Sequence, residues 1–457
     1  MVSFIVYDIV FMIVFTLVIS LLLYKNKKNV KREGVMFTYH TQWGTKSMKT
    51  IDDKFHKVIG VARYAVVILG FVLMIAMIAM LIQSAWNYIT IPELSEIIKA
   101  PPIAPLIPYF PQLFGMESMF PPFYFVYFLI AISIVGLVHE FSHGIFMRYS
   151  KTKIKSTGIV FLGPIPGAFV EQDDKSFKKK SRFNQMSVLG AGVFANTLTA
   201  IIFYLLYIGF FAISFSPAGY VFNTYSISQL NTADITNISQ MGEYGIISTA
   251  EADYFLDIEM LDKFSTQDNF FAYDNTSAFR AGLVGIIVGV DDVKISEQSD
   301  LAVALAKYKP NDKVVIHTLI DENETSYDII LGEHPVDSEK AYLGVGNTQS
   351  LDKSSTLKRF LTTLMGFKDS SINYETTWNE DFVYFIYHLL WWVMIINILV
   401  ALFNMLPWGI LDGGRFFELA MDKFFGEKTT KILTRIMGRA ILAILVVMMG
   451  YWFVRLF

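Results

Sequence analysis

The chain has 457 residues, of which 53% are hydrophobic and 17% charged, and its formal net charge is −3. Soluble domains carry about 25% charged residues, so this composition indicates a membrane protein with a substantial soluble part. The small net charge gives no reason to expect a nucleic acid partner. The absence of cysteine excludes disulfides, thiol nucleophiles and cysteine-ligated zinc.

Six apolar stretches are long enough to cross ~30 Å of hydrocarbon, which takes about 20 residues. They lie near residues 3–24, 61–84, 122–147, 187–214, 382–406 and 438–456. Positive charges follow the first stretch instead of preceding it, so we interpret it as a span and not as a cleaved signal peptide. The predicted fold class is a polytopic α-helical membrane protein.

Lys and Arg residues concentrate in three connections: the one after the first span, 148–186 and 407–437. The connection over 85–121 has one lysine, Lys99, and many prolines. Because positively charged loops face the cytoplasm, this alternation predicts that both termini and residues 215–381 lie outside it. We expect a multi-pass protein of the cell membrane.

Four parts follow from this arrangement. Residues 1–121 would hold two N-terminal spans, a basic cytoplasmic loop and a proline-rich outer loop. Residues 122–214 would hold the third and fourth spans, 215–381 an extracytoplasmic domain, and 382–457 the last two spans.

The external domain contains a region with several short β-type runs and one helix-like run. This region, residues 265–347, resembles a PDZ domain, with the helix-like run at 299–308. A PDZ-like domain would bind an extended peptide by strand addition. The alternative is an ordinary β-rich domain.

Residues 156–171 are apolar but too short to span, and they contain two prolines and three glycines. Non-helical apolar backbone is tolerated at membrane depth only when it packs on protein or lines a wet cavity. The segment therefore predicts a re-entrant β-hairpin, with an apolar loop at the inner surface as the alternative.

Residues 138–144 read Val-His-Glu-Phe-Ser-His-Gly within the third predicted span. On a helix, His139 and His143 lie one turn apart on one face, where two imidazoles can hold a zinc ion. Glu140 is then placed to act as a general base. The preceding residues 123–138 carry no charge, and ionisable groups at such depth are costly unless they have a function or a partner.

A hydrolytic zinc site uses three protein ligands and one open position. Asp412 is the best candidate for the third ligand, because it lies just past the fifth predicted span. Pro407 should break the helix before it, and Gly413 and Gly414 should permit a turn that aims the carboxylate sideways.

The depths of these residues agree. His139 lies about 17 residues into the third span, which is roughly 25 Å at ~1.5 Å per residue. The fifth span also runs inward and ends just before Asp412. Both segments should therefore meet near the cytoplasmic side of the membrane.

Asn196 in the fourth span and Asn404 at the end of the fifth are further candidates. A buried Asn can donate to a developing oxyanion or orient a substrate backbone. The alternative for each is an interhelical hydrogen bond without a catalytic part.

Three motifs occur in order along the chain: H-E-x-x-H at 139–143, G-x-x-x-N at 192–196 and N-x-x-P-x-x-x-x-D-G at 404–413. With a PDZ-like insertion before the third, this combination resembles the site-2 protease family of intramembrane zinc metalloproteases. The similarity covers roughly residues 120–425.

The resemblance implies that zinc is the cofactor and that the substrate is itself a transmembrane helix, partly unwound and cut within the bilayer, usually to release a regulatory domain. It implies zinc ligation by His139, His143 and Asp412, activation of the attacking water by Glu140, and substrate binding by Asn196 and Asn404. It carries no role onto residues 1–121.

Two rival functions remain open at this point. One is another class of membrane zinc peptidase, with a Glu as the third ligand. The other is a peptide-binding membrane scaffold or a transporter without catalysis, in which the external domain would bind peptides.

Overall fold

The computed structural model of the protein describes residues 4–26, 30–90, 106–242, 244–258, 260–261, 268–321, 323–347, 364 and 366–456. The middle of the predicted proline-rich loop, 91–105, lies outside the described residues. The chain forms two compact units. The first contains Met1–Phe211 and Asp381–Phe457, and the second contains Ala212–Ser354 and Leu361–Glu380.

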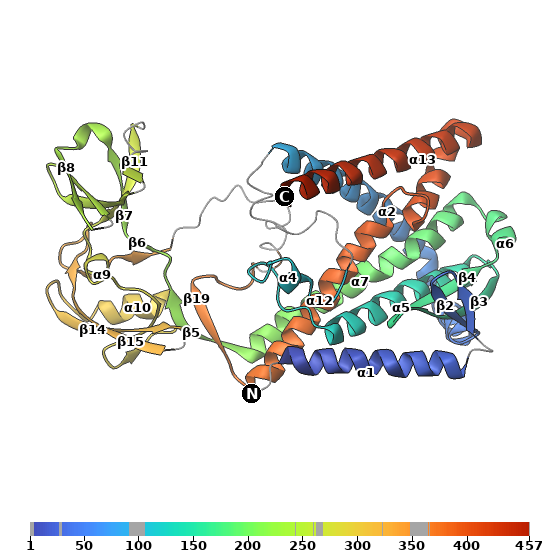
Figure 1. The fold of residues 1–457 in the computed structure, drawn as a ribbon, viewed down its shortest axis with the longest axis horizontal. Coiled ribbons are helices and arrows are strands. Elements are labelled where there is room, and N and C mark those ends of the chain that lie inside the picture. Colours follow the sequence, from blue (N-terminus) through green and yellow to red (C-terminus); the bar gives the residue numbers. More distant parts are fainter. Residues whose placement is uncertain are drawn as a thin grey trace. The chain divides into compact units, whose positions relative to one another are not determined.

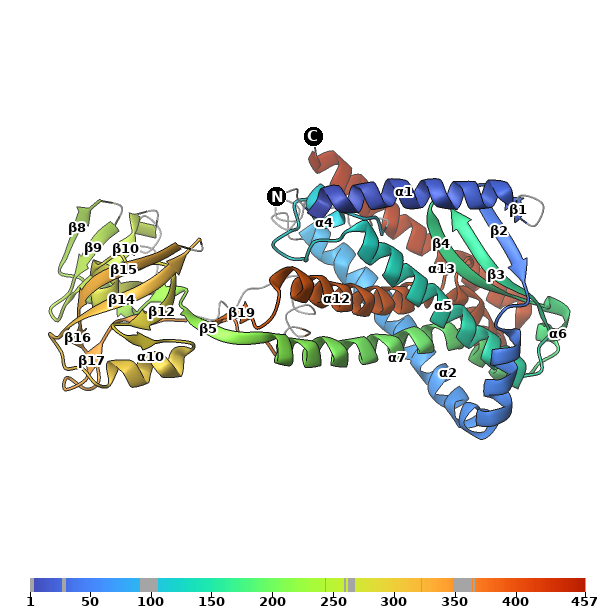
Figure 2. The ribbon, with the colours of Figure 1, turned by 90° about the horizontal axis from the view of Figure 1, so that it is seen from below.

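Six helices in the described part of the chain are long and apolar enough to cross a membrane (Figures 1 and 2). They are α1 (Phe4–Lys25), α2 (Thr45–Thr90), α5 (Phe125–Tyr149), α7 (Arg182–Ser214), α12 (Glu380–Asn404) and α13 (Asp412–Leu456). Each predicted span overlaps one of them, so the polytopic α-helical fold class is confirmed. Two of these helices are longer than predicted because they continue through kinks, at Phe55 in α2 and Gly426 in α13.

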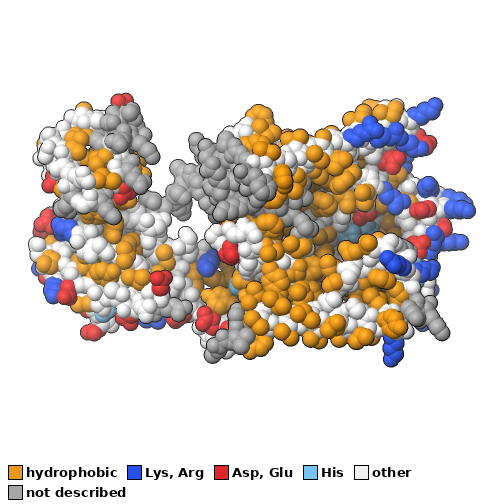
Figure 3. Space-filling view, in the orientation of Figure 1, with side chains coloured by type: hydrophobic (Ala, Val, Ile, Leu, Met, Phe, Trp, Pro, Cys, Tyr) orange, Lys and Arg blue, Asp and Glu red, His pale blue; other side chains and the backbone are white. Residues whose placement is uncertain are grey.

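The surface of the first unit is apolar over its helices, and Lys and Arg side chains gather at one end (Figure 3). The start of α1 and the end of α13 both lie toward the other end of this unit (Figures 1 and 2). An even number of crossings returns the chain to the side on which it began, which matches this placement of the termini.

A buried carboxylate ties α1 to the start of α5. Asp8 is only 3% exposed, although α1 is otherwise almost entirely at the surface. Its carboxylate accepts hydrogen bonds from the backbone N–H groups of Phe125 (2.6 Å) and Val126 (3.0 Å) and from the hydroxyl of Tyr109 (2.6 Å). These N–H groups have no partner within the helix, and negative charge is favourable at a helix N-terminus. Asp8 therefore caps α5 from a different helix.

A four-stranded antiparallel sheet lies beside α5 (Figures 1 and 2). Residues 156–171 fall in a β-hairpin of β3 (Ile154–Leu162) and β4 (Ile165–Gln172), with Gly163 at positive φ in its turn. The hairpin's depth in the membrane stays a prediction. In the order β1-β2-β3-β4, the sheet continues with β2 (Met36–Thr41) and β1 (Val30–Glu33). The basic connection after α1 therefore contains two strands, of which β2 pairs with β3 and β1 pairs with β2.

The second unit contains two larger sheets. One has the order β15-β14-β12-β5-β19 and packs against α10 (Gln298–Leu305) through a core that includes Ile287, Leu301 and Ile316. Its strands are β5 (Phe215–Val221), β12 (Ile286–Val290), β14 (Lys313–Ile320), β15 (Asn323–Ile330) and β19 (Ile372–Thr376). The strands and the helix expected within 265–347 are thus present, while the likeness to a PDZ domain stays a prediction.

The other large sheet, with the order β7-β11-β10-β9-β8, lies mostly before residue 265, outside the region where strands were expected. Its strands are β7 (Ile227–Asn231), β8 (Asn237–Met241), β9 (Tyr244–Ser248), β10 (Asp253–Asp257) and β11 (Asn269–Asp274). The remaining short elements are α4 (Phe110–Leu113), α6 (Asp174–Lys178), β6 (Thr224–Tyr225), η1 (Thr232–Asp234), α9 (Ser277–Arg280), β13 (Val293–Lys294), β16 (Gly332–Glu333), β17 (Ala341–Tyr342) and β18 (Val345–Gly346).

Because Asp8 caps α5, we expect Asp8→Ala to destabilise the protein strongly. The substitution leaves two backbone N–H groups of α5 without a partner, which should lower the free energy of unfolding by about 2–4 kcal/mol. Titration of the purified protein from dodecylmaltoside into SDS measures this change. Thr16→Ala on the same helix removes only a hydroxyl bonded to the carbonyl of Met12 and should change the midpoint little. Equal effects of the two substitutions would contradict the cap.

Candidate metal centre

The two histidines of α5 point at one place. The helix is apolar from Phe125 onward, so its 3.6-residue repeat puts His139 and His143 on the same face. Both are buried, at 7% and 6% exposure. Their Nε2 atoms lie 3.1 Å apart.

Asp412 joins them from the first residue of α13. Its Oδ2 lies 3.2 Å from Nε2 of His139 and 3.2 Å from Nε2 of His143. An acidic side chain is favoured at the first turn of a helix, where the backbone N–H groups concentrate positive charge. The structure thus brings together the three residues that the sequence predicted to be metal ligands.

The prediction that Gly413 and Gly414 form the turn before α13 was wrong. Gly413 and Gly414 do not form the turn, because both lie in α13 and neither has a positive φ. A Cβ on Gly413 would lie 2.3 Å from the carbonyl carbon of Met405, and one on Gly414 would lie 2.3 Å from the carbonyl oxygen of Trp408. These glycines let the turn after α12 pack directly against the start of α13, which places Asp412.

The geometry fits a zinc ion. The three ligand atoms all lie within 4.8 Å of one another. With bonds of ~2.0–2.1 Å, the edge of a tetrahedron of zinc ligands is about 3.3 Å, close to the separations of 3.1 and 3.2 Å found here. Three ligands also leave one coordination position for water or substrate.

Helix α7 orients both imidazoles. The Nδ1–H of His143 donates to the carbonyl of Val188 (2.7 Å), which leaves Nε2 free to bind a metal. The hydroxyl of Ser142 donates to the carbonyl of Ala191 (2.9 Å) and fixes the two helices together. A Cβ on Gly192 would lie 2.5 Å from His139 Cε1 and 2.5 Å from His143 Nε2. The rings therefore occupy the space that a side chain at 192 would fill.

Asn196 lies directly behind one ligand. Its side-chain nitrogen is 3.1 Å from Nδ1 of His139, the residue is fully buried, and its Oδ1 has no hydrogen-bond partner. A His139 that binds metal through Nε2 carries its proton on Nδ1 and needs an acceptor there. Exchanging the oxygen and nitrogen of the Asn196 amide supplies that acceptor and gives Oδ1 its partner. In the form of His139 that binds a metal ion through Nε2, the Nδ1–H group therefore supplies the hydrogen-bond partner that Oδ1 of Asn196 lacks.

Glu140 lies on the neighbouring face of α5, outside the three-ligand cluster. Its Oε2 accepts a hydrogen bond from the backbone N–H of Val170 in β4 (2.9 Å). Asn404 is the last residue of α12 and is half-buried, also outside the cluster. The direct binding of substrate by Asn196 and Asn404 stays a prediction.

Some of these contacts had no signal in the sequence. The roles of Val188 and Val170 belong to backbone atoms, which no residue type marks. Asp8, by contrast, was a charge inside an apolar run, and charges in such runs usually have a partner or a function.

Comparison with known proteins gives two results. A model of peptidase family M50 matches residues 127–448. An uncharacterized protein of Methanocaldococcus jannaschii is 30% identical over 188 residues, which are 40% of this chain and 46% of that protein. The match thus spans about half of that relative's length.

The packing of α7 on the imidazoles predicts the effect of Gly192→Ala. The added methyl group would displace both rings and should weaken zinc binding by at least about tenfold, as loss of ligand orientation typically does. Competition with a fluorescent zinc chelator measures the affinity. Gly209→Ala is the matched control, because a Cβ at this position of the same helix meets nothing within 4 Å. Wild-type affinity in Gly192→Ala would contradict the packing argument.

Proposed function

The chain belongs to peptidase family M50, the site-2 protease family, and on this basis we propose that it is a zinc-dependent intramembrane endopeptidase. The family is one of metallopeptidases, and the six apolar helices make the chain a multi-pass membrane protein. The finer points proposed here are the metal, the residues that act and the kind of substrate.

The convergence of His139, His143 and Asp412 carries this proposal. Two of them lie in α5 and one starts α13, and both helices are candidate membrane spans. A third ligand that is Asp, and not Glu, favours this class over the other membrane zinc peptidases. A peptide-binding scaffold would need no such set of buried ligands.

A zinc ion at these ligands would act as a Lewis acid toward the scissile carbonyl and would make the attacking water more acidic. Glu140 takes the proton from that water and delivers it to the leaving nitrogen. Asn196 holds His139 in the tautomer that leaves Nε2 free, and with Asn404 it helps to hold the substrate.

The proposed substrate is a transmembrane helix of another protein. A helix hides its carbonyl groups in hydrogen bonds to residues one turn later, so it must unwind locally before it can be cut. Strand β4 supports capture of the unwound segment, because the N–H of Val170 is directed to Glu140 and not to β3. An extended substrate at this edge would lie along the general base.

The basic end of the first unit supports a cytoplasmic placement of that end in the cell membrane. The termini and the second unit would then lie outside the cytoplasm, where the PDZ-like region would bind a peptide. Cleavage would fall near the cytoplasmic end of the substrate helix and release a regulatory domain.

Two substitutions test the proposal. Glu140→Gln should bind zinc like the wild type but cleave a transmembrane substrate about 10²–10⁴-fold more slowly, because it removes only the proton acceptor. Asp412→Ala should lose both zinc and cleavage. Elemental analysis gives the zinc content, and gel or mass analysis of products gives the rate.

Glu427→Gln is the matched control, since this exposed glutamate of α13 pairs only with Lys431 among the described residues. Wild-type cleavage by Glu140→Gln would refute the assignment of the base. Full zinc content in Asp412→Ala would point to the class of peptidase with a different third ligand. Glu140→Gln also offers a way to trap natural substrates in cells.

A further inference from the structure

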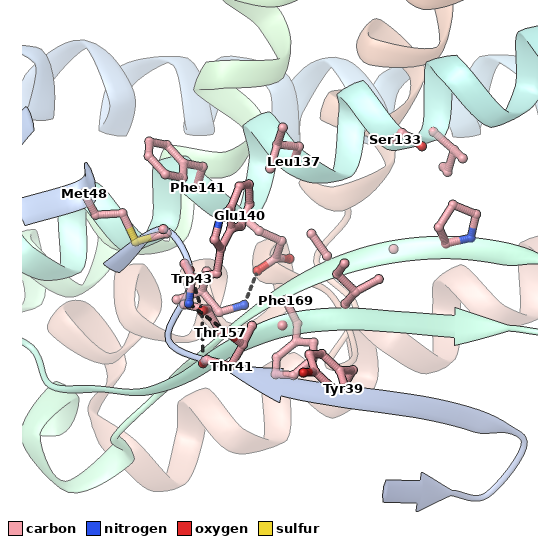
Figure 4. A pocket seen from close by; sticks show the side chains of 18 residues that line it. Tyr39, Thr41, Trp43, Met48, Ser133, Leu137, Glu140, Phe141, Thr157 and Phe169 are labelled. Carbon is pink, nitrogen blue, oxygen red and sulfur yellow. Dashed lines mark hydrogen bonds between the residues drawn. The ribbon is translucent and has the colours of Figure 1, made fainter. Parts of the chain in front are cut away.

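A cavity of about 440 Å³ lies between α5 and the sheet formed by β2, β3 and β4 (Figure 4). The side chain of Glu140 projects into it from α5 and accepts the hydrogen bond from Val170 of β4. The cavity therefore adjoins the group proposed to be the general base. The residues around Glu140 are mainly apolar, among them Leu137, Phe141 and Phe169.

Part of the cavity wall comes from a segment that the family match does not include. The match covers residues 127–448, whereas the wall contains residues of β2, of the start of α2 and of the turn between them, namely Tyr39, Thr41, Trp43, Gly44 and Met48. The candidate metal ligands all lie within the matched residues, whereas this part of the cavity wall does not.

This N-terminal wall is held firmly against the rest of the unit. The hydroxyl of Thr157 in β3 lies within hydrogen-bond distance of the carbonyls of Thr41 (3.2 Å) and Trp43 (2.7 Å). Met48 is 2% exposed and packs on α5, where a Cβ on Gly144 would lie 2.4 Å from its Sδ. The wall is therefore part of the packed structure and can set the size of what enters.

The size and shape of the cavity suit more than one side chain. A cavity of ~150 Å³ holds one benzene ring, so 440 Å³ holds a large apolar side chain with room for part of another. Residues 166–170 of β4 run along it. In an extended peptide beside β4, every second side chain would point to the same face of the sheet.

We propose that this cavity receives large apolar side chains of the substrate next to the cleaved bond, and that residues 39–48 determine which side chains fit. The proposal rests on the proposed protease function. A lipid acyl chain is the competing occupant, but the carboxylate of Glu140 in the wall and the peptide edge of β4 along it favour a peptide. The N-terminal segment would thus give this chain a substrate preference of its own.

Two substitutions of opposite effect test it. Met48→Ala enlarges the cavity, and Thr41→Phe fills part of it. The substrates are model transmembrane peptides that differ only in having Ala, Leu, Phe or Trp at each position near the cleaved bond in turn. We expect the ratio of kcat/KM for Trp over Leu to rise about tenfold in Met48→Ala, and the ratio for Phe over Ala to fall about tenfold in Thr41→Phe.

Met74→Ala is the matched control, because Met74 is also a buried methionine of α2 but does not line the cavity. It should leave both ratios unchanged. A common change in the rates for all peptides in both cavity variants would overturn the proposal, because damaged folding or a displaced lipid acts on every peptide alike. Wild-type cleavage with unchanged ratios would overturn the cavity role and leave the protease function standing. If the wild type cleaves no peptide and binds no zinc, both proposals fail.

A second readout does not depend on turnover. A photoreactive phenylalanine analogue at the preferred substrate position should crosslink to residues 39–48 of the Glu140→Gln protein, and mass analysis locates the adduct. Crosslinks confined to other segments would overturn the proposal even if the rates behaved as expected.

Discussion

The close approach of α7 to α5 is the constraint on which the candidate metal centre depends. Two imidazoles one turn apart on α5 need room on the side that faces the neighbouring helix, and Gly192 provides it by having no side chain. Val188 and Asn196 lie one turn before and one turn after it on the same face of α7, where each contacts Nδ1 of one histidine. One stripe of α7 therefore makes the space for the ligands and also fixes their orientation.

Helix α5 is also held at both ends by contacts with the N-terminal helices α1 and α2. Asp8 caps its start, and Met48 packs on Gly144 near its end. An error of about 1 Å in the placement of a reacting group can cost roughly 10²-fold in rate, so these contacts would matter for the proposed activity. The N-terminal segment is thus integrated with the metal centre, although it lies outside the matched residues 127–448.

Glu140 connects three features of the first unit. It lies next to the metal ligands on α5, accepts the hydrogen bond from Val170 in β4, and projects into the cavity bounded by the N-terminal wall. In an apolar surrounding a carboxylate must have a partner, and the edge of the sheet provides one. The same edge is where an extended substrate would pair, so under the proposed function the sheet would both hold Glu140 and bring the substrate to it.

The sequence by itself determined the six apolar helices and the shared face of His139 and His143, because hydropathy and helical repeat are local properties of the chain. It also identified Asp412 as the candidate third ligand, since the depth of a residue in a span follows from counting residues along the chain. Tertiary structure alone decided what lies against these residues. The pairing of residues 36–41 with 157–162 joins segments more than a hundred residues apart, and the contact of Asn196 with His139 depends on how two helices pack. The contacts of Gly413 and Gly414 follow from a backbone approach that their residue type permits but does not specify. Such non-local contacts depend on the shape of the whole unit, which no window of sequence contains.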